Sequence, residues 1–347
     1  MNSSLPLLSC NSSRAETCGV EPQSPALTVF LSLVFLGGIL LNSFSLWIFC
    51  FRMPQWSSGT ILQFHLALSD AIGTPAAPFL AAYFSLGSTW PFGQFLCQLM
   101  VIFLSTHLYG SIFFLMLISV HRYVAVVHFS KSSPIRRRGF MKKLCLGVWL
   151  ALLALGLTFF GFLKTSQVGN HTLCLSIHQG ELTGAYFAVN FVLLVPGFLV
   201  PFGVSATCYG LLLCSLSKMN TINQKAWAVK AKSLRMIAGS VAIFAVCFVP
   251  LQVARTVGVV LKNFFPDRCS LLQWTEVAYY ASWVLAGANC CLDPVLYCFG
   301  SRKFTQTFRS SLRRVGVRFR DGAAEPEEGE SASQSVTSGG TASARAP

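Results

Sequence analysis

Seven long apolar stretches divide this chain. Each contains about 20 mostly apolar residues, the length that an α-helix needs to cross the hydrocarbon core of a bilayer. We expect the spans at residues 26–51, 58–85, 95–127, 142–163, 186–216, 233–261 and 271–299. All should be helices, because an isolated strand leaves its backbone polar groups unpaired in lipid. The sequence therefore predicts an all-α membrane protein, a seven-helix transmembrane bundle over residues 26–300.

The composition agrees with a membrane protein. Only 11% of the 347 residues are charged, against about 25% in soluble domains. The net charge of +14 would suggest nucleic acid as a partner in a soluble protein. Here the basic residues lie between the apolar spans rather than on one face, which is the pattern of membrane topology. We expect membrane lipid, and no nucleic acid, as a partner.

The loop charges predict the orientation. Lys and Arg concentrate after the third, fifth and seventh spans, at residues 131–143, 218–235 and 302–314. Cytoplasmic loops carry this excess of positive charge. We therefore expect a multi-pass plasma membrane protein with an extracellular N-terminus and a cytoplasmic C-terminus. Residues 1–25 are polar and lack a signal-peptide core, so the first span should direct insertion.

Glycosylation triplets and cysteines fit this orientation. Asn2, Asn11 and Asn170 each begin an Asn-x-Ser/Thr triplet on the expected outer side. Residues 1–25 should thus form a glycosylated extracellular segment. Cysteines at the oxidising side can form disulfides, and five of the 13 fall there or at its edge: Cys10, Cys18, Cys97, Cys174 and Cys269.

The C-terminal region divides into two parts. In residues 301–315, Phe304, Phe308 and Leu312 recur at helical spacing between basic residues. This pattern predicts an amphipathic eighth helix on the inner leaflet. Residues 316–347 should be a disordered cytoplasmic tail. Its serines and threonines are either a solvated tail or a phosphorylation cluster that adds negative charge.

Three charged residues lie inside the apolar spans at places where charge is costly: Asp70, Arg122 and Asp293. An ionisable group costs several kcal/mol in hydrocarbon, so its presence there is a functional hypothesis by default. We interpret these three residues as parts of a buried polar switch. The six histidines form no cluster with carboxylates that a membrane metallohydrolase would need, so we expect no enzyme.

Short motifs accompany the charged residues in a fixed order along the spans. They comprise Asn42 in Gly-Ile-Leu-Leu-Asn, Asp70 in Leu-Ala-Leu-Ser-Asp, Cys97, His121-Arg122-Tyr123, Trp149, Pro201 with Tyr209, Phe244-Ala-Val-Cys-Phe-Val-Pro250, and Asp293-Pro294-Val-Leu-Tyr297. In this order and at these depths, residues 26 to about 315 resemble rhodopsin-like (class A) G-protein-coupled receptors. The resemblance implies coupling to a heterotrimeric G protein, with arrestin and receptor kinases acting on the Ser/Thr-rich tail.

The resemblance assigns four polar residues to a mid-membrane sodium pocket: Asp70, Ser111, Asn289 and Asp293. Oxygen ligands suit a hard cation, and a cation would offset the cost of two buried carboxylates. The alternative is a hydrogen-bonded polar knot that only packs the helices. Sodium is the only metal that we expect, and no other cofactor.

The resemblance also assigns a switch. Its residues are Arg122, Tyr123, Tyr209, Phe244, Phe248, Pro250, Pro294 and Tyr297. Pro250 should kink the sixth span, which gives the ligand a two-state element to act on. His121 replaces the usual acidic residue before the arginine, and Lys230 replaces one at the inner end of span six. An arginine–carboxylate lock is therefore doubtful, and a loose lock could raise basal activity.

By resemblance, Cys97 pairs with Cys174. Cys269 then pairs with either Cys18 or Cys10, and one of those two is left over. The less favoured alternative is that the four cysteines of the outer segments, Cys10, Cys18, Cys174 and Cys269, are all free thiols, since the exterior is oxidising.

The outer half of the bundle indicates the ligand class. Leu104 stands where amine receptors carry Asp, so an amine is not expected. Arginine suits the capture of phosphate or carboxylate. Arg255 lies deep in its span, where it contacts the ligand, extends its charge toward water or pairs with Glu276. The expected ligand-binding residues are Arg255, Gln252, Lys164 and an aromatic wall of Phe103, Tyr109, Tyr279, Tyr280 and Trp283.

These details resemble the nucleotide, lysophospholipid and organic-acid receptor branch. Val101 and Trp283 stand where nucleotide receptors commonly carry further cations, which disfavours a triphosphate. We therefore expect an anionic amphipathic ligand, a lysophospholipid or an oxidised fatty acid, and activation by outward movement of span six. A nucleotide or small carboxylate is the alternative, as is a constitutively active or modulatory receptor with no agonist.

Overall fold

The structure is a computed structural model of the chain. It describes residues 18, 23–127, 133–174, 176, 183–218 and 224–314. The predicted glycosylation sites Asn2 and Asn11, the alternative cysteine Cys10 and the tail from residue 315 onward lie outside the described residues.

The first half of the chain forms helices that correspond to the first four expected spans. They are α1 (Pro25–Trp47) with η1 (Ile48–Arg52), α2 (Ser58–Gly73), α3 (Ala76–Ser85), α4 (Gly93–Val126), η2 (Pro134–Arg136) and α5 (Arg138–Phe162). Local sequence explains two of the starts. Ser24 and Ser57 each accept a hydrogen bond from a backbone N–H of the first turn that follows, as helix N-cap residues do.

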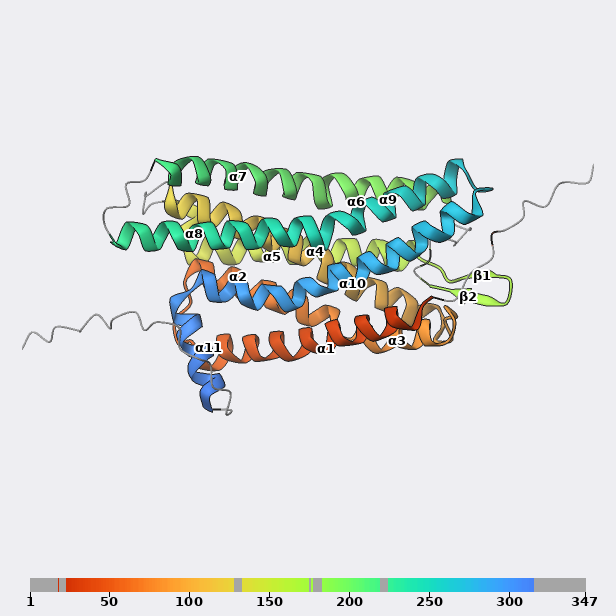
Figure 1. Ribbon diagram of the computed structural model, residues 1–347, viewed down its shortest axis with the longest axis horizontal. Helices are drawn as coiled ribbons and strands as arrows, with labels where there is room; N and C mark the ends of the chain where they lie inside the picture. Colours follow the sequence, from red (N-terminus) through yellow and green to blue (C-terminus); the bar gives the residue numbers. More distant parts are fainter. Residues whose placement is uncertain are drawn as a thin grey trace, which may run out of the picture. The chain divides into compact units, whose positions relative to one another are not determined.

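The second half begins with a hairpin and continues with helices. Its elements are β1 (Ser166–Val168), β2 (His171–Leu173), α6 (Thr183–Leu194), η3 (Val195–Leu199), α7 (Val200–Ser217), α8 (Gln224–Ala242), η4 (Ile243–Phe248), α9 (Val249–Phe264), α10 (Cys269–Gly300) and α11 (Arg302–Arg314). The strands pair antiparallel, with Ser166 opposite Leu173. Figure 1 shows the long helices running side by side, with the hairpin at one end of the bundle.

The expected second span is two helices rather than one. Six helices of the described residues are long and apolar enough to cross a membrane. The exception is the span at 58–85, which breaks between Gly73 and Ala76 into α2 and α3. Pro75 has no N–H to continue the helical hydrogen bonds, and the side chain of Thr74 instead donates to the carbonyl of Ala71 at 2.7 Å.

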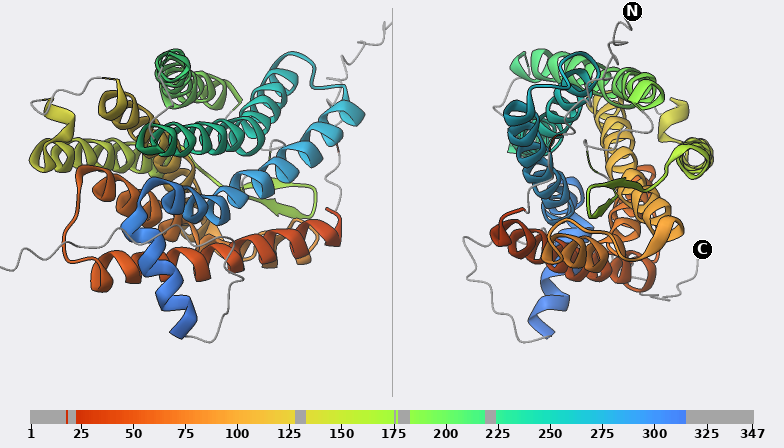
Figure 2. Two further views of the ribbon diagram at one scale, coloured as in Figure 1. Left: turned by 60° about the vertical axis from the view of Figure 1, so that its left-hand side comes forward. Right: turned by 90° about the vertical axis from the view of Figure 1, so that its right-hand side faces the viewer.

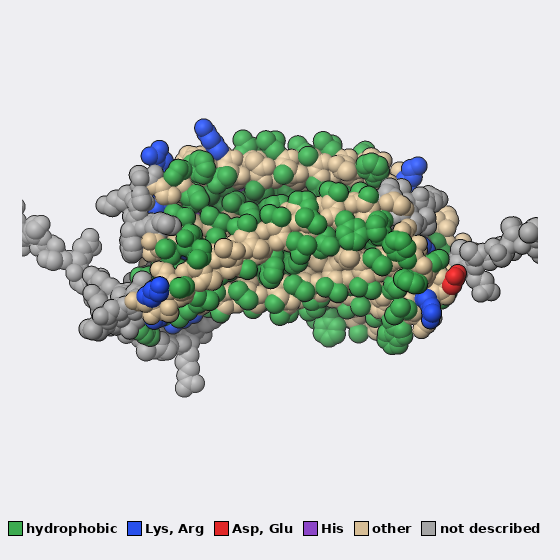
Figure 3. Space-filling view, turned by 90° about the horizontal axis from the view of Figure 1, so that it is seen from above, with side chains coloured by type: hydrophobic (Ala, Val, Ile, Leu, Met, Phe, Trp, Pro, Cys, Tyr) green, Lys and Arg blue, Asp and Glu red, His purple; other side chains and the backbone are tan. Residues whose placement is uncertain are grey.

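The outer flank of the bundle is apolar. Large hydrophobic side chains are more than half exposed on several helices, among them Phe30, Leu40, Leu157 and Val192. Figure 3 shows hydrophobic side chains spread along one face, with Lys and Arg near its two ends. In water an apolar surface of this extent would drive association. It is the surface expected of a bundle whose flank faces lipid.

Two disulfides join outer elements. Cys97, near the start of α4, pairs with Cys174, which directly follows β2. Cys18 pairs with Cys269, the first residue of α10. The first pairing is the one that the family resemblance implied, and the second selects Cys18 from the two alternatives. The right-hand view of Figure 2 looks at this end, where the hairpin lies among the helix ends.

An amphipathic helix, α11, follows α10, as the sequence predicted. Phe304 is fully buried and stacks on Phe49 of η1, with ring centroids 4.9 Å apart, and it also contacts Tyr297. Phe308 lies edge-on to Phe44. These aromatic contacts fasten the start of α11 to the inner ends of α1 and α10. The compact unit of the chain ends at Phe308.

Candidate functional site

Arg255 is the centre of a hydrogen-bonded cluster between α4, α6 and α9. It projects from α9 and is only 7% exposed. Its Nε donates to Asn190 Oδ1 of α6 at 2.9 Å, Nη1 to Tyr109 Oη of α4 at 2.7 Å, and Nη2 to Gln252 Oε1 at 2.6 Å. The guanidinium therefore joins three helices, and each of its nitrogens has one acceptor.

All three acceptors of Arg255 are neutral. Among the described residues no carboxylate pairs with it; Glu276, the alternative partner, accepts from Ser176 at 2.5 Å and Tyr280 at 3.2 Å. A buried charge without a counter-charge is costly, several kcal/mol per ion. Two hydrogens of the terminal nitrogens are still available after these bonds. The site can thus receive an anionic group that would supply the missing negative charge.

Unused donors lie close to this arginine. Gln252 Nε2 is buried and makes no hydrogen bond within the described part of the chain, and the buried Trp283 Nε1 has only a weak contact with the Tyr279 side chain. Tyr279 lies edge-on to Trp283, with ring centroids 6.3 Å apart, and interacts electrostatically with Arg255. A buried donor without an acceptor costs about 1–3 kcal/mol. An acceptor-rich ligand group would satisfy these atoms.

The structure separates some of the predicted ligand residues from this cluster. Gln252, Tyr109, Tyr279 and Arg255 come together. Tyr280 also contacts Tyr279, at 5.5 Å between ring centroids, but its hydroxyl donates to Glu276 and its ring lies edge-on to Phe84 of α3, at 4.8 Å. Phe103 is half-buried on α4, and Lys164 is exposed just after α5. The assignment of Tyr280, Phe103 and Lys164 to the ligand site stays a prediction.

Sequence reasoning did not include Asn190 and Tyr186. Asn190 is buried on α6 and also donates to Thr256 Oγ1 at 3.4 Å. Tyr186 interacts with Arg255, Tyr109 and Tyr279. Asn190 is an amide in an otherwise apolar span, and a polar group at that depth needs a partner. This polar residue within an apolar span was the sequence signal that could have identified Asn190 as part of the site.

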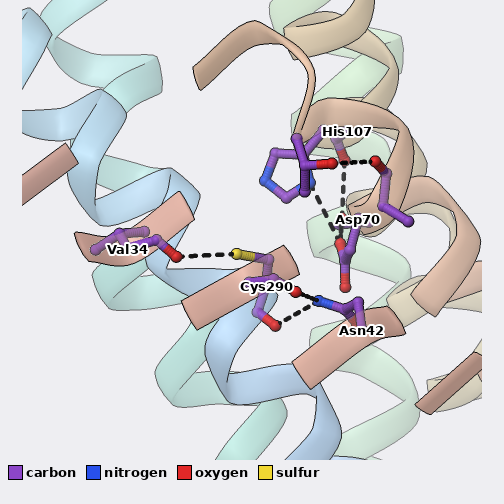
Figure 4. Close-up of polar contacts among 9 residues, drawn as sticks. Val34, Asn42, Asp70, His107 and Cys290 are labelled. Carbon is purple, nitrogen blue, oxygen red and sulfur yellow. Dashed lines mark hydrogen bonds and ion pairs between the residues drawn. The ribbon is translucent and has the colours of Figure 1, made fainter. Parts of the chain in front are cut away.

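A second polar cluster lies inside the bundle, around Asp70 of α2. Ser111 of α4 donates to Asp70 Oδ1 at 2.8 Å, and His107 Nδ1 lies 3.3 Å from the same oxygen. All three residues are at most 2% exposed. In Figure 4 the His107 ring points toward Asp70, while Asn42 lies on the other side and donates to the carbonyl of Cys290.

Several oxygens of this cluster have no hydrogen-bond donor among the described residues. They are Asp70 Oδ2, Asn289 Oδ1, Asn42 Oδ1 and both carboxylate oxygens of Asp293. Asn289 Nδ2 likewise has no acceptor in hydrogen-bond geometry within the described part of the chain, and the Asp293 carboxyl lies close to the side chains of Asp70 and Asn289. Buried acceptors without donors call for an explanation, such as an ion. The unpaired acceptor atoms, which could serve as metal ligands, are all oxygens, so these residues fit a hard cation. His107 was not among the predicted pocket residues, although a histidine within a span was a signal.

Among the predicted switch residues, Arg122 contacts the last residue of α10. Arg122 Nη2 donates to the backbone carbonyl of Gly300 at 2.6 Å. Tyr209 of α7 interacts electrostatically with Arg122 and packs with Leu212 and Leu216, against which Tyr123 also packs. The doubt about an arginine–carboxylate lock agrees with this geometry: Arg122 has no carboxylate partner among the described residues.

The sixth span changes its winding where the sequence predicts a hinge. Residues 243–248 form η4, a π-helical turn, directly before Pro250. Proline removes a backbone donor, and π-turns inside helices often mark functional positions. Phe244 and Phe248 are buried there, 5.6 Å apart between ring centroids. On the facing α10, Pro294 lies inside the helix and Tyr297 is fully buried.

Comparison with known proteins identifies the family. The family model described as 7 transmembrane receptor (rhodopsin family) matches residues 41–297. Purinoceptor 4 of Rattus norvegicus is 34% identical over 288 residues, covering 83% of this chain and 79% of that protein. Purinoceptor 2 of Homo sapiens is 35% identical over 292 residues, covering 84% and 77% respectively.

A relative with a lipid ligand in its name is nearly as similar. Lysophosphatidic acid receptor 4 of Mus musculus is 33% identical over 278 residues, covering 80% of this chain and 75% of that protein. The match therefore places the chain in the nucleotide and lysophospholipid branch without choosing between the two ligand classes. The chain belongs to the rhodopsin family of seven-transmembrane, G-protein-coupled receptors, which are signalling proteins and not enzymes.

Proposed function

We propose that this receptor binds an extracellular ligand through one anionic group that contacts Arg255. The observation that carries the proposal is the charge of this residue: the guanidinium is 7% exposed, and its acceptors Asn190, Tyr109 and Gln252 are all neutral. A ligand carboxylate or phosphate would provide both the counter-charge and a bidentate acceptor.

The number of nearby cations favours a ligand with a single anionic head. Lys262 interacts with the Glu276 carboxylate. Lys164 and Arg268 are exposed. One buried cation balances about one negative charge, and a triphosphate would bring more charge than the described pocket residues offset. The aromatic side chains of Tyr109, Tyr279 and Trp283 suit an apolar body. This combination favours a lysophospholipid or an oxidised fatty acid.

A nucleotide or a small carboxylate is the second candidate. Relatives named purinoceptors are as similar to this chain as the relative named lysophosphatidic acid receptor. Signalling without an agonist is a third outcome, and the test below distinguishes it.

The remaining parts of the proposal concern topology and signalling. The receptor is a plasma membrane protein with its N-terminus outside, and Asn170 is a glycosylation site; its exposure at the β1–β2 turn supports this. Ligand binding moves the inner half of α8 outward to open the G-protein site. The tail, which lies outside the described residues, recruits receptor kinases and arrestin.

We further propose a sodium ion as an allosteric ligand of the Asp70 cluster. The residues that would hold it are Asp70, Ser111, Asn289 and Asp293; the unsatisfied oxygens of Asp70, Asn289 and Asp293 support this assignment. When bound, the ion supplies positive charge between two buried carboxylates. Asp70 also accepts the Ser111 hydroxyl, so α2 and α4 are already joined at this point.

The test is G-protein activation in membranes from cells that express the full chain. The panel contains lysophospholipids, oxidised fatty acids, nucleotides and small carboxylates. Arg255→Ala should abolish the response to the active compound, and Arg255→Lys should restore it only in part, because lysine keeps the charge but not the fork. Arg268→Ala, which removes an exposed outer arginine, is the matched control. An unchanged dose–response in Arg255→Ala would exclude this arginine from the ligand site.

A further inference from the structure

Arg122 is bonded to the end of another helix rather than to an acidic side chain. Its Nη2 donates to the carbonyl of Gly300 at 2.6 Å, across 178 residues of sequence. Gly300 is the last residue of α10, and Ser301 continues in an extended conformation. The last carbonyls of a helix have no partner within the helix and form the negative end of its dipole. A cation is therefore well placed at this carbonyl.

The neighbouring carbonyls at the end of α10 are already used. Ser301 N donates to the carbonyl of Tyr297 at 3.0 Å. Thr305 Oγ1 donates to the carbonyl of Cys298 at 2.6 Å and to that of Ser301 at 3.0 Å. Residues 301 and 305, at the start of the following helix, thus satisfy these neighbouring carbonyls, whereas the Gly300 carbonyl accepts its hydrogen bond from Arg122.

The residue before the arginine is turned toward a different helix. His121 Nε2 lies 2.9 Å from Ser58 Oγ at the start of α2. Gly59 leaves room for this ring, because a Cβ there would lie 3.2 Å from His121 Cε1. An imidazole is neutral or positively charged, so His121 does not give Arg122 the counter-charge that an acidic residue would supply.

The absence of a side chain at Gly300 leaves room for both Gln63 and Arg122. A Cβ at position 300 would overlap Gln63 Nε2 and would lie 3.1 Å from Arg122 Nη2. No positive φ is found there, so backbone conformation does not demand glycine. The absent side chain leaves the space through which the arginine reaches the carbonyl.

We propose that the Gly300 carbonyl holds Arg122 in the resting receptor, replacing an arginine–carboxylate lock, and that Gly300 is a positioning residue for Arg122. This inference rests on the family's G-protein coupling through Arg122. A guanidinium bonded to its own chain's carbonyl is withheld from the G protein. Release of the Arg122 guanidinium then requires the inner end of α10, the seventh span, to move. The availability of Arg122 to the G protein therefore depends directly on the position of that span.

The experiment measures ligand-independent G-protein activation at matched surface expression. Gln63→Ala is the reference variant, because it removes the side chain that a residue at 300 would overlap. Adding Gly300→Ala to it leaves the conflict with Arg122 as the main change. We expect basal activation to rise at least threefold over Gln63→Ala alone. Gly139→Ala, at a position where a Cβ meets nothing within 4 Å, should not alter it.

A further substitution tests whether the effect passes through the arginine. His121→Asp, added to the Gln63→Ala and Gly300→Ala variant, gives Arg122 a carboxylate and should return basal activation to the reference level. Equal basal activation with and without Gly300→Ala would overturn the proposal, as would a rise that His121→Asp leaves unchanged. Because no ligand is used, a failure here differs from a failure of the anionic-ligand proposal, which would appear only in the compound panel.

Discussion

His107 Nδ1 lies 3.3 Å from Asp70 Oδ1, on the same oxygen that accepts the Ser111 hydroxyl. One carboxylate oxygen of Asp70 is therefore occupied by α4, while the other, Oδ2, has no donor among the described residues. The two oxygens have different roles in consequence. Oδ1 joins helices, and Oδ2 is free for a cation together with Asn289 and Asp293.

Asp70→Asn should weaken the effect of sodium on agonist affinity. The amide is neutral, so the cluster keeps its helix-joining oxygen but loses the charge that the Asp70 carboxylate would offer a cation. The measurement is agonist binding in membranes with sodium chloride replaced by a matched potassium salt. Ser45→Ala, which removes a buried hydroxyl bonded within α1, is the control. Sodium sensitivity equal to that of the unsubstituted chain would count against the ion pocket.

Tyr109→Phe should lower agonist potency about tenfold. The change removes the acceptor of Arg255 Nη1, and the loss of a hydrogen bond to a buried charged group costs about 1.5–3 kcal/mol. A freed guanidinium is also less well oriented for its ligand. Dose–response curves of G-protein activation give the shift. Tyr83→Phe on α3 makes the same chemical change away from Arg255, and an identical shift in both variants would refute a specific role for Tyr109.

Glu276→Gln should leave agonist potency within about threefold of the original value. Glu276 accepts from Ser176 and Tyr280, and Arg255 bonds to neutral groups instead. If Glu276 were the counter-ion of Arg255, neutralising it would raise the affinity for an anion markedly, and a potency gain above tenfold would contradict the structure. Surface labelling accompanies the assay, because Ser176 loses a charged acceptor.

Phe304→Ala should lower the thermal stability of the purified receptor. The ring is fully buried between Phe49 and Tyr297. Truncating a buried Phe to Ala costs about 3–5 kcal/mol in well-packed cores. A thermal unfolding assay in detergent measures the loss. Phe265→Ala removes a ring that is 55% exposed beyond the end of α9. Similar melting temperatures for the two variants would mean that the start of α11 is not fastened by this residue.

Much of the architecture follows from local sequence. Apolar length predicts a span wherever it reaches about 20 residues, so the seven spans and the amphipathic segment after them were identifiable without contacts. The break in the second span was not, although Pro75 and Pro78 were visible in the sequence. A proline in a transmembrane helix can kink it or end it, and neighbouring helices decide which.

The sequence by itself determined which residues carry charge at depth: Asp70, Arg122, Arg255 and Asp293. Only the tertiary structure decided their partners. Arg255 bonds to Tyr109, 146 residues away, and to Asn190 rather than to Glu276. Cys269 joins Cys18 rather than Cys10, and Arg122 reaches the Gly300 carbonyl, which any residue could provide. The physical reason is that a partner depends on which faces of distant helices meet, and every residue carries the same backbone carbonyl, so composition and spacing leave these choices open.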